Sequence, residues 1–245
     1  MKTIQRLKYM FVYTIPLTVL FAFNLDGAWT FITLITFFGL VPLLELLLPP
    51  DRENIDKKLA DDEKNQKVYD YILYATLPIQ IGFLIYFFYV IGQTPFGTLD
   101  YIGRITAMGF MCGVVGINVG HELGHRNTRW EQLMGEILLL TSLDTHFLPY
   151  HNAGHHRNVA TPEDAATARK NELLIVYWFR SHFGSYIEAW HLENQRLRES
   201  HRSWFSLQNR MVVYSIANVT LLVLVYAIFG MNVLIAFLGA AICGI

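Results

Sequence analysis

The stretch AWTFITLITFFGLVPLLELLLP occupies residues 28–49, and its single charged residue, Glu45, lies close to its C-terminal end. About 20 consecutive apolar residues form a helix long enough to cross a lipid bilayer. Comparable apolar stretches lie at residues 9–25, 70–92, 99–120 and 211–229, and residues 231–245 begin another. The sequence therefore predicts an all-α, polytopic membrane helix bundle with about six transmembrane helices, the last of them cut short.

The composition is that of an integral membrane protein. Hydrophobic residues make up 53 % of the 245 residues and charged residues only 16 %, against about 25 % charged in a typical soluble domain. The formal net charge of −1, without a basic stripe, argues against a nucleic-acid partner. Cys112 and Cys243 lie in apolar segments and are interpreted as small core thiols. Because no repeat or flexible linker interrupts the chain, residues 1–245 are predicted to form one membrane-embedded domain.

Two histidine clusters follow the fourth apolar stretch: HELGH at residues 121–125 and HNAGHH at residues 151–156. Residues four apart on a helix are neighbours, so both histidines of each four-residue pair can reach one metal ion. A single catalytic zinc needs three protein ligands, and five clustered imidazoles suggest two metals, or one metal with spare neighbours. The predicted metal ligands are His121, His125, His151, His155 and His156.

The orientation of the chain follows from its basic residues, because short loops rich in Lys and Arg stay in the cytoplasm. Segment 1–8 contains three of them and loop 51–68 contains five, whereas loops 25–27 and 93–98 contain none. The N-terminus is therefore predicted to be cytoplasmic, and four spans return the first histidine cluster to that face.

Residues 130–150 decide whether the two clusters can meet. They include Glu131, Glu136, Asp144 and His146, and each charge costs roughly 2.5–3.5 kcal/mol at the bilayer centre. This segment is therefore predicted to be re-entrant or interfacial and not to cross. Both histidine clusters then lie on the cytoplasmic face and form one site.

The first cluster also matches H-E-x-x-H, the signature of zinc metalloproteases, in which Glu122 would act as general base. An intramembrane zinc protease is therefore an alternative. The second cluster argues against it, because such a protease needs only one further ligand, commonly a carboxylate on a later helix. Residues 211–245 contain neither Asp nor Glu.

Other polar residues near the clusters have two readings each. Glu122 is favoured to hydrogen-bond a ligand imidazole and fix its tautomer. Glu163 and Asp164 are either similar partners or the first-turn acids of a helix that starts at Thr161, with Pro162 at its first position. His146 is a weaker candidate ligand, and three histidines of the polar segment are predicted to be ordinary surface residues: His182, His191 and His201.

Three further patterns concern the surfaces of helices. Residues 173–200 mix aromatic and charged residues, which predicts a long amphipathic helix at the membrane surface. The small residues of the fourth span predict close helix packing, with a tunnel wall as the alternative: Gly109, Gly113, Gly116 and Gly120. Three arginines are either membrane anchors or part of a docking face for an acidic electron carrier: Arg126, Arg157 and Arg169.

Three motifs together resemble one family. HELGHR at 121–126 matches H-E-x-x-H-K/R, HNAGHH at 151–156 matches H-N-x-G-H-H, and VATPEDAATAR at 159–169 is similar to V-A-T-P-E-D-P-A-[ST]-[AS]-R. These are motifs of the integral-membrane alkane monooxygenases (alkane hydroxylases), within the membrane fatty acid desaturase and hydroxylase group. The resemblance runs from about residue 28 to residue 245.

The resemblance implies an enzyme of the bacterial inner membrane. It implies six membrane helices, cytoplasmic histidines, two non-haem iron ions, O2 as co-substrate, and electrons from rubredoxin and its reductase. The reaction would be terminal hydroxylation of a medium-chain alkane or a similar apolar lipid. A fatty acyl desaturase or hydroxylase of the same group is an alternative, and so is an inactive membrane fragment.

The chain departs from the family pattern in two places. Tyr150 precedes the second cluster, where many members have Glu. The third histidine box, of L-Q-R-H-S-D-H-H type, and the N-Y-x-E-H-Y-G element do not occur before the chain ends at Gly244-Ile245. We therefore expect a C-terminally truncated chain that lacks about four of the ligands that the resemblance implies.

Overall fold

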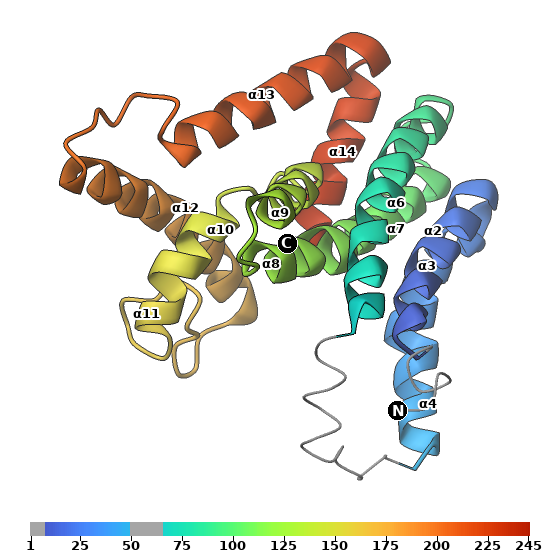
Figure 1. Ribbon diagram of the computed structural model, residues 1–245. Coiled ribbons are helices and arrows are strands. Elements are labelled where there is room, and N and C mark those ends of the chain that lie inside the picture. The colour runs from blue at the N-terminus through green and yellow to red at the C-terminus, as the bar shows by residue number, and fades with distance from the viewer. Residues whose placement is uncertain (1–7, 50–65) are drawn as a thin grey trace. The chain divides into compact units, whose positions relative to one another are not determined.

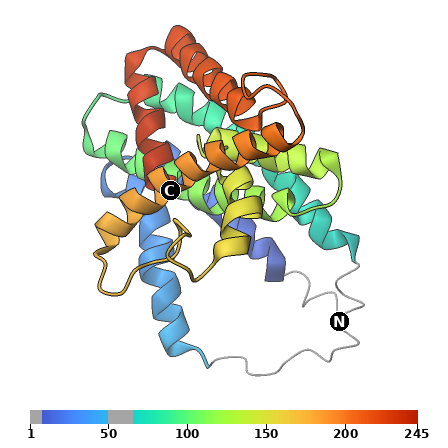
Figure 2. The same ribbon diagram turned by 90° about the vertical axis from the view of Figure 1, so that its left-hand side faces the viewer.

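The computed structural model describes residues 8–49 and 66–245, and among these residues every regular element is helical (Figures 1 and 2). The Lys and Arg residues of 1–7 and 50–65, which contribute to the predicted orientation, lie outside the described residues. The chain divides into two compact units. The span unit comprises Met1–Val119 and Val225–Ile245, and the histidine unit comprises Gly120–Leu224.

The helices of the span unit follow the apolar stretches of the sequence. Their bounds are η1 Lys8–Tyr13, α2 Thr14–Asn24, η2 Gly27–Phe31, α3 Ile32–Leu34, η3 Ile35–Leu40, α4 Val41–Leu47, α6 Lys67–Gly92, α7 Leu99–Met111, η4 Cys112–Ile117 and α14 Met231–Gly244. Helices α8 Asn118–Gly124 and α13 Arg210–Phe229 each contain a boundary between the units.

Among the described residues, four helices are long and apolar enough to cross a membrane: Gly27–Leu47, Lys67–Gly92, Leu99–Gly124 and Arg210–Phe229. They confirm four of the predicted spans as candidates. The first apolar stretch forms η1 and α2, and the last forms α14, which is shorter than the other candidates. The predicted total of about six spans requires that these two stretches also cross the membrane, which remains a prediction.

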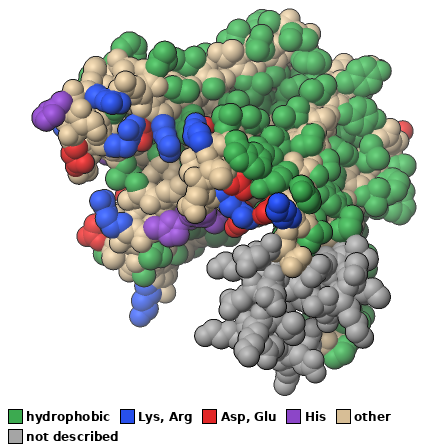
Figure 3. All heavy atoms as spheres, in the orientation of Figure 1, with side chains coloured by type: hydrophobic (Ala, Val, Ile, Leu, Met, Phe, Trp, Pro, Cys, Tyr) green, Lys and Arg blue, Asp and Glu red, His purple; other side chains and the backbone are tan. Residues whose placement is uncertain are grey.

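The span helices expose apolar side chains, as helices in contact with lipid do. Leu46 is 84 % exposed, Leu47 70 % and Ile228 67 %. Hydrophobic side chains cover much of the face seen in Figure 3. This distribution supports integral insertion in a membrane.

Glycines let α7 and η4 approach α14 closely. A Cβ atom added at Gly109 would lie 2.5 Å from Cβ of Cys243, and one at Gly113 would lie 2.6 Å from the carbonyl oxygen of Gly244. The interpretation of these glycines as packing positions is thereby supported. Cys112 is buried as predicted, whereas the prediction of a core thiol is wrong for Cys243, which is exposed.

Gly109→Ala is expected to lower the free energy of unfolding in detergent by about 1–3 kcal/mol, because the new methyl group overpacks α7 against α14. Gly82→Ala is the matched control. No atom lies within 4 Å of its added Cβ, so the higher helix propensity of Ala is expected to stabilise the chain by about 0.5–1 kcal/mol. Thermal unfolding of both variants measures the difference, and shifts of the same sign would contradict this packing account.

The histidine unit contains the C-terminal part of α8, then α9 Arg129–Thr141, α10 Phe147–Tyr150, η5 His151–His155, α11 His156–Asn158, α12 Leu174–Glu199 and the larger part of α13, up to Leu224. Helix α9 is about 20 Å long at 1.5 Å per residue, shorter than the roughly 30 Å hydrocarbon core of a bilayer. Its length agrees with the prediction that residues 130–150 do not cross.

Helix α12 confirms the long helix predicted over 173–200. Its buried residues recur every four positions and form one stripe: Ser185, Ala189, Glu193 and Leu197. Large apolar side chains outside this stripe, such as Phe179 and Phe183, are exposed. Helix α12 lies beside α10 and η5 in both ribbon views (orange and yellow in Figures 1 and 2).

The prediction of a helix starting at Thr161 is wrong. Residues 159–173 form turns, and no helix begins before α12. Ala160 has a φ of +67°, in the left-handed region, and its N–H donates to Oγ1 of Thr167. Asp164 accepts from the N–H of Ala166. Side chains thus bond backbone groups of this segment locally, which competes with helix formation.

Candidate metal centre

Helix α8 carries His121 in its last turns, His125 follows in the turn directly after Gly124, and η5 brings His151 against both. The Nε2 atom of His121 lies 2.8 Å from Nε2 of His151 and 2.7 Å from Nε2 of His125. Ligand bonds of about 2.1 Å to a shared ion set neighbouring nitrogens roughly 3 Å apart. These three imidazoles therefore form a donor set that fits one metal ion.

A π-helical turn brings the other two histidines of the second cluster to the same side. The N–H of His156 bonds to the carbonyl oxygen of His151, five residues earlier, and this wide turn aligns residues four and five positions apart. The ring of His151 lies 5.1 Å from that of His155 and 4.5 Å from that of His156. Short π segments occur frequently at functional sites.

A close contact with α12 fixes η5. Gly154 is buried, and a Cβ atom added to it would lie 2.7 Å from Oε1 of Glu188. A side chain at position 154 would therefore force the Glu188 carboxylate of α12 to move.

A buried carboxylate orients His155. Nδ1 of His155 lies 2.9 Å from Oδ2 of Asp164, whose side chain has no exposed surface. Because a carboxylate accepts hydrogen bonds, Nδ1 carries the proton and Nε2 keeps its lone pair for a metal. Burial alone would raise the pKa of Asp164, but hydrogen bonds, including those from Thr167 and Tyr150, outweigh it and lower the pKa. Asp164 therefore stays ionised.

Tyr150 is a functional residue that the sequence did not reveal as one. Its hydroxyl donates a short hydrogen bond to Oδ1 of Asp164 and accepts one of 2.8 Å from the N–H of Ala166. Thr167 Oγ1 also donates to Asp164, at 2.6 Å. The only available signal was that Tyr150 stands where the family motif has a carboxylate.

The other candidate residues take different positions. Of the two neighbouring acids, Asp164 pairs with the imidazole of His155, and Glu163 is exposed. Glu122 forms an ion pair with Arg126 at 3.2 Å in place of the predicted hydrogen bond to an imidazole. His191 and His201 are exposed as predicted.

One prediction about histidines is wrong, because His182 is not an ordinary surface residue. His146, named above as the weaker candidate ligand, groups with His182 and Asp144 and not with the five clustered histidines. The two rings lie 5.1 Å apart, and a ligand atom from each can meet one from Asp144. They form a second group, discussed below.

Electrostatics favour the neutral form of the imidazole that binds metals. Burial, followed by the repulsion of neighbouring histidines, lowers the pKa of His151 to about 3. A neutral imidazole has a free lone pair and binds metal without first losing a proton. At neutral pH His151 is therefore ready to act as a ligand.

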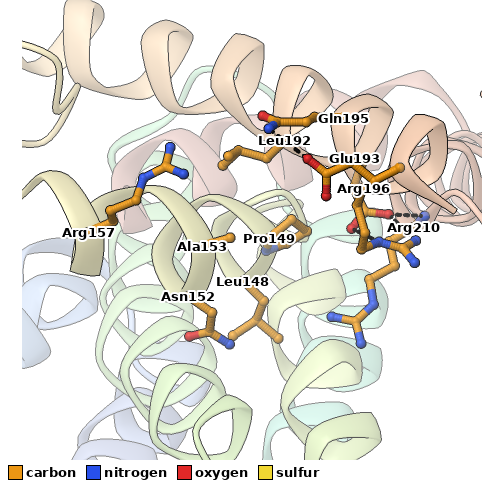
Figure 4. A pocket seen from close by; sticks show the side chains of 11 residues that line it. Leu148, Pro149, Asn152, Ala153, Arg157, Leu192, Glu193, Gln195, Arg196 and Arg210 are labelled. Carbon is orange, nitrogen blue, oxygen red and sulfur yellow. Dashed lines mark hydrogen bonds and ion pairs between the residues drawn. The ribbon is translucent and has the colours of Figure 1, made fainter.

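A groove of about 450 Å³ runs between α10, η5 and α12 (Figure 4). Arg157 lies toward one end of it, and Arg196 and Arg210 toward the other. Arg196 is paired with Glu193 at 2.8 Å, whereas Arg157 is exposed. Three arginines and two glutamates line the groove, and both readings of Arg157, membrane anchor and part of a docking face, stay open.

Arg180 holds the loop that carries Asp164. Its Nε donates to Oε1 of Glu172 at 2.6 Å, and its remaining nitrogens donate to the carbonyl oxygens of Ala165 and Thr167. The hydrogen bonds from Arg180 and from the N–H of Arg169 hold the pKa of Glu172 at about 2.

The stability of the chain is expected to decline in acid partly through Glu172. Because folding depresses this pKa from its ordinary value of 4.5 to about 2, the stabilisation is complete above pH 4.5 and is lost as the pH falls toward 2. Glu172→Gln is expected to flatten this part of a plot of melting temperature against pH. Glu163→Gln, at an exposed site, is expected to leave the plot unchanged, and equal plots for both variants would refute the assignment.

The chain is similar to known proteins over most of its length. The family model described as fatty acid desaturase matches residues 99–245. Alkane 1-monooxygenase 1 of Alcanivorax borkumensis is 33 % identical over 207 residues, which cover 84 % of this chain and 51 % of the relative. Alkane 1-monooxygenase 1 of Pseudomonas aeruginosa is 36 % identical over 215 residues, 87 % of this chain and 56 % of the relative.

A more distant relative is the xylene/toluene monooxygenase hydroxylase component of Pseudomonas putida. It is 25 % identical over 211 residues, which cover 85 % of this chain and 55 % of the relative. The chain spans about half the length of the curated relatives it matches. All of the histidines described above lie within the part that the family model matches.

Proposed function

Because the chain belongs to the fatty acid desaturase family, we propose that it carries the metal centre of a membrane monooxygenase. The proposed reaction is hydroxylation of the terminal carbon of a medium-chain alkane or a similar apolar lipid, with O2 as co-substrate. The observation that carries the proposal is the convergence of the Nε2 atoms of His121, His125 and His151, in a chain whose curated relatives are named alkane monooxygenases.

The proposed metal is non-haem iron, with two ions held in the full-length protein by the clustered histidines together with the further ligands that the resemblance implies. The ligands contributed by this chain are His121, His125, His151, His155 and His156. Imidazole binds iron, zinc and copper alike, so the names of the relatives support this choice more than the donor atoms do. Iron bound here would supply the activation of O2.

The residues of the chain prepare the site for that chemistry. Asp164 holds the proton of His155 on Nδ1, and the low pKa of His151 keeps its imidazole neutral. The span helices expose leucines and isoleucines, as helices in contact with lipid do. The proposed apolar substrate would enter from the bilayer.

The proposed partners complete the electron supply. Rubredoxin, reduced by its reductase, would deliver electrons to histidine boxes on the cytoplasmic face of a bacterial inner membrane. The relatives named as monooxygenases support a separate electron donor in general terms. The positive-inside rule supports the orientation.

The test is product analysis under 18O2. Membranes that contain the chain are supplied with octane, rubredoxin, its reductase and NADH, and the products are identified by mass spectrometry. The expected product is 1-octanol carrying one 18O atom. An alkene in its place would favour the desaturase alternative, and iron-loaded chain that forms neither product would contradict the proposal.

The zinc protease alternative has its own outcome in the same preparation. Glu122, its required general base, is paired with Arg126, which disfavours that reading. A chain that retains zinc at His121 and His125, consumes no O2 and cleaves peptides would restore it.

A further inference from the structure

Asp144 is placed by the end of α9. Its N–H bonds to the carbonyl oxygen of Leu139 at 3.0 Å, and the N–H of Leu143 bonds to that of Leu140 at 3.1 Å. This is the hydrogen-bond pattern of a Schellman motif, with Leu143 at a φ of +57° in the position usually taken by Gly. The turn directs Asp144 into the histidine unit, where it is 4 % exposed.

Three side chains converge there from two elements. Oδ1 of Asp144 lies 3.2 Å from Nδ1 of His146, and the rings of His146 and His182 lie 5.1 Å apart. One ligand atom from each of the three residues lies within 4.8 Å of the others. His146 is 5 % exposed, so this group is largely closed to solvent.

The hydrogen bonds of Ser185 fix the tautomer of His146. The Ser185 hydroxyl donates its single proton to the carbonyl oxygen of His182 at 2.8 Å. It therefore accepts, at 3.3 Å, from Nε2 of His146, which must carry the ring proton. Nδ1 then presents a lone pair to the carboxylate of Asp144, and two acceptors this close need a positive charge between them.

A cavity of about 270 Å³ adjoins the group. Its lining includes His146 and His182 together with polar side chains of α13, among them Asn218. Asn218 donates from Nδ2 to Thr145, but its buried Oδ1 has no hydrogen-bond partner within residues 8–49 and 66–245. The lining combines apolar and polar side chains, and Oδ1 of Asn218 is an acceptor that suits a water bound at an open coordination position.

We propose that Asp144, His146 and His182 bind a divalent first-row transition-metal ion at a second site, separate from the five clustered histidines. Two imidazoles and one carboxylate with an open position form the donor set of many catalytic zinc sites and of non-haem Fe(II) sites. Ser185 acts as the positioning residue that orients His146. The open position faces the cavity.

The alternative to a metal ion between Asp144 and His146 is a proton. Burial raises the pKa of Asp144 to about 8, so a neutral carboxyl group could donate to Nδ1 of His146. Asp144→Asn separates the two accounts. The Asn amide donates to Nδ1 as the protonated carboxyl would, but it cannot replace a carboxylate as an anionic metal ligand.

The experiment first removes the other site. The chain carrying His121→Ala and His151→Ala is purified in detergent, stripped with chelator and titrated with Zn2+ and with Fe2+ against a chromophoric chelator. In this titration we expect the variant to bind one ion per chain tightly. Adding Asp144→Asn or His182→Ala to this variant is expected to raise the dissociation constant of the ion by at least about 100-fold. Loss of a residue that only hydrogen-bonds a metal ligand typically weakens metal binding by about 10–100-fold.

His191→Ala is the matched control, because His191 is an exposed histidine of the same helix and its loss should leave the affinity unchanged. X-ray absorption on the metal-loaded background is expected to show two imidazoles and one carboxylate. A background chain that is folded by circular dichroism yet binds no ion would overturn the proposal. Equal affinity with and without Asp144→Asn would also overturn it.

Discussion

Replacement of His151 by alanine is expected to remove iron from the clustered histidines and to abolish hydroxylation. His151 is the residue that joins the two clusters, because its Nε2 lies 2.8 Å from that of His121 and its ring lies beside those of His155 and His156. Loss of an outer partner costs 10–100-fold in affinity, and loss of this ligand is expected to cost at least about 100-fold. Iron content and the rate of 1-octanol formation measure the effect.

His191→Ala is the control for the change in histidine content and is expected to keep both iron and activity, since His191 is exposed and distant in sequence from the clusters. Equal iron content in the two variants would show that His151 is not a ligand. Retained iron with lost activity would assign His151 a role other than metal binding.

Replacement of Asp164 by alanine is expected to destabilise the chain by about 3–5 kcal/mol, the cost of removing one partner from a buried charged network. The side chain of Asp164 is fully buried and accepts hydrogen bonds from four groups: Tyr150 Oη, Thr167 Oγ1, the Ala166 N–H and His155 Nδ1. The substitution strands these donors and releases His155. Metal affinity is therefore expected to fall by about 10–100-fold as well.

Glu163→Ala is the matched control, because the neighbouring carboxylate is exposed and such a change is expected to stay within about 0.5 kcal/mol. Unfolding in detergent and iron titration are measured for both variants. If Asp164→Ala behaves as Glu163→Ala does, the buried network has no role in stability or in the orientation of His155.

The elements that could be predicted from sequence are those encoded by local spacing. Runs of apolar residues predicted four spans that the structure confirms as candidates, and four-residue histidine spacing predicted which imidazoles lie together. The mixed composition of 173–200 predicted α12. Each of these signals depends only on residues within one or two helical turns.

The features that could not be predicted depend on contacts between distant residues. His182 meets Asp144 and His146 only because α12 packs against α10, and no local pattern records that packing. The helix expected at Thr161 fails because the buried carboxylate of Asp164 bonds groups of its own loop. The π-helical turn of η5 likewise gives no signal beyond the spacing of its histidines.

The central claim is that the clustered histidines bind non-haem iron, and the most direct measurement is the iron content of the purified chain before and after His151→Ala. Cells are grown with iron, the chain is purified in detergent, and metals are counted by mass spectrometry alongside the His191→Ala control. The account predicts that the purified chain binds iron, that His151→Ala removes it and that His191→Ala retains it. Zinc in place of iron, or iron that survives His151→Ala, would contradict it.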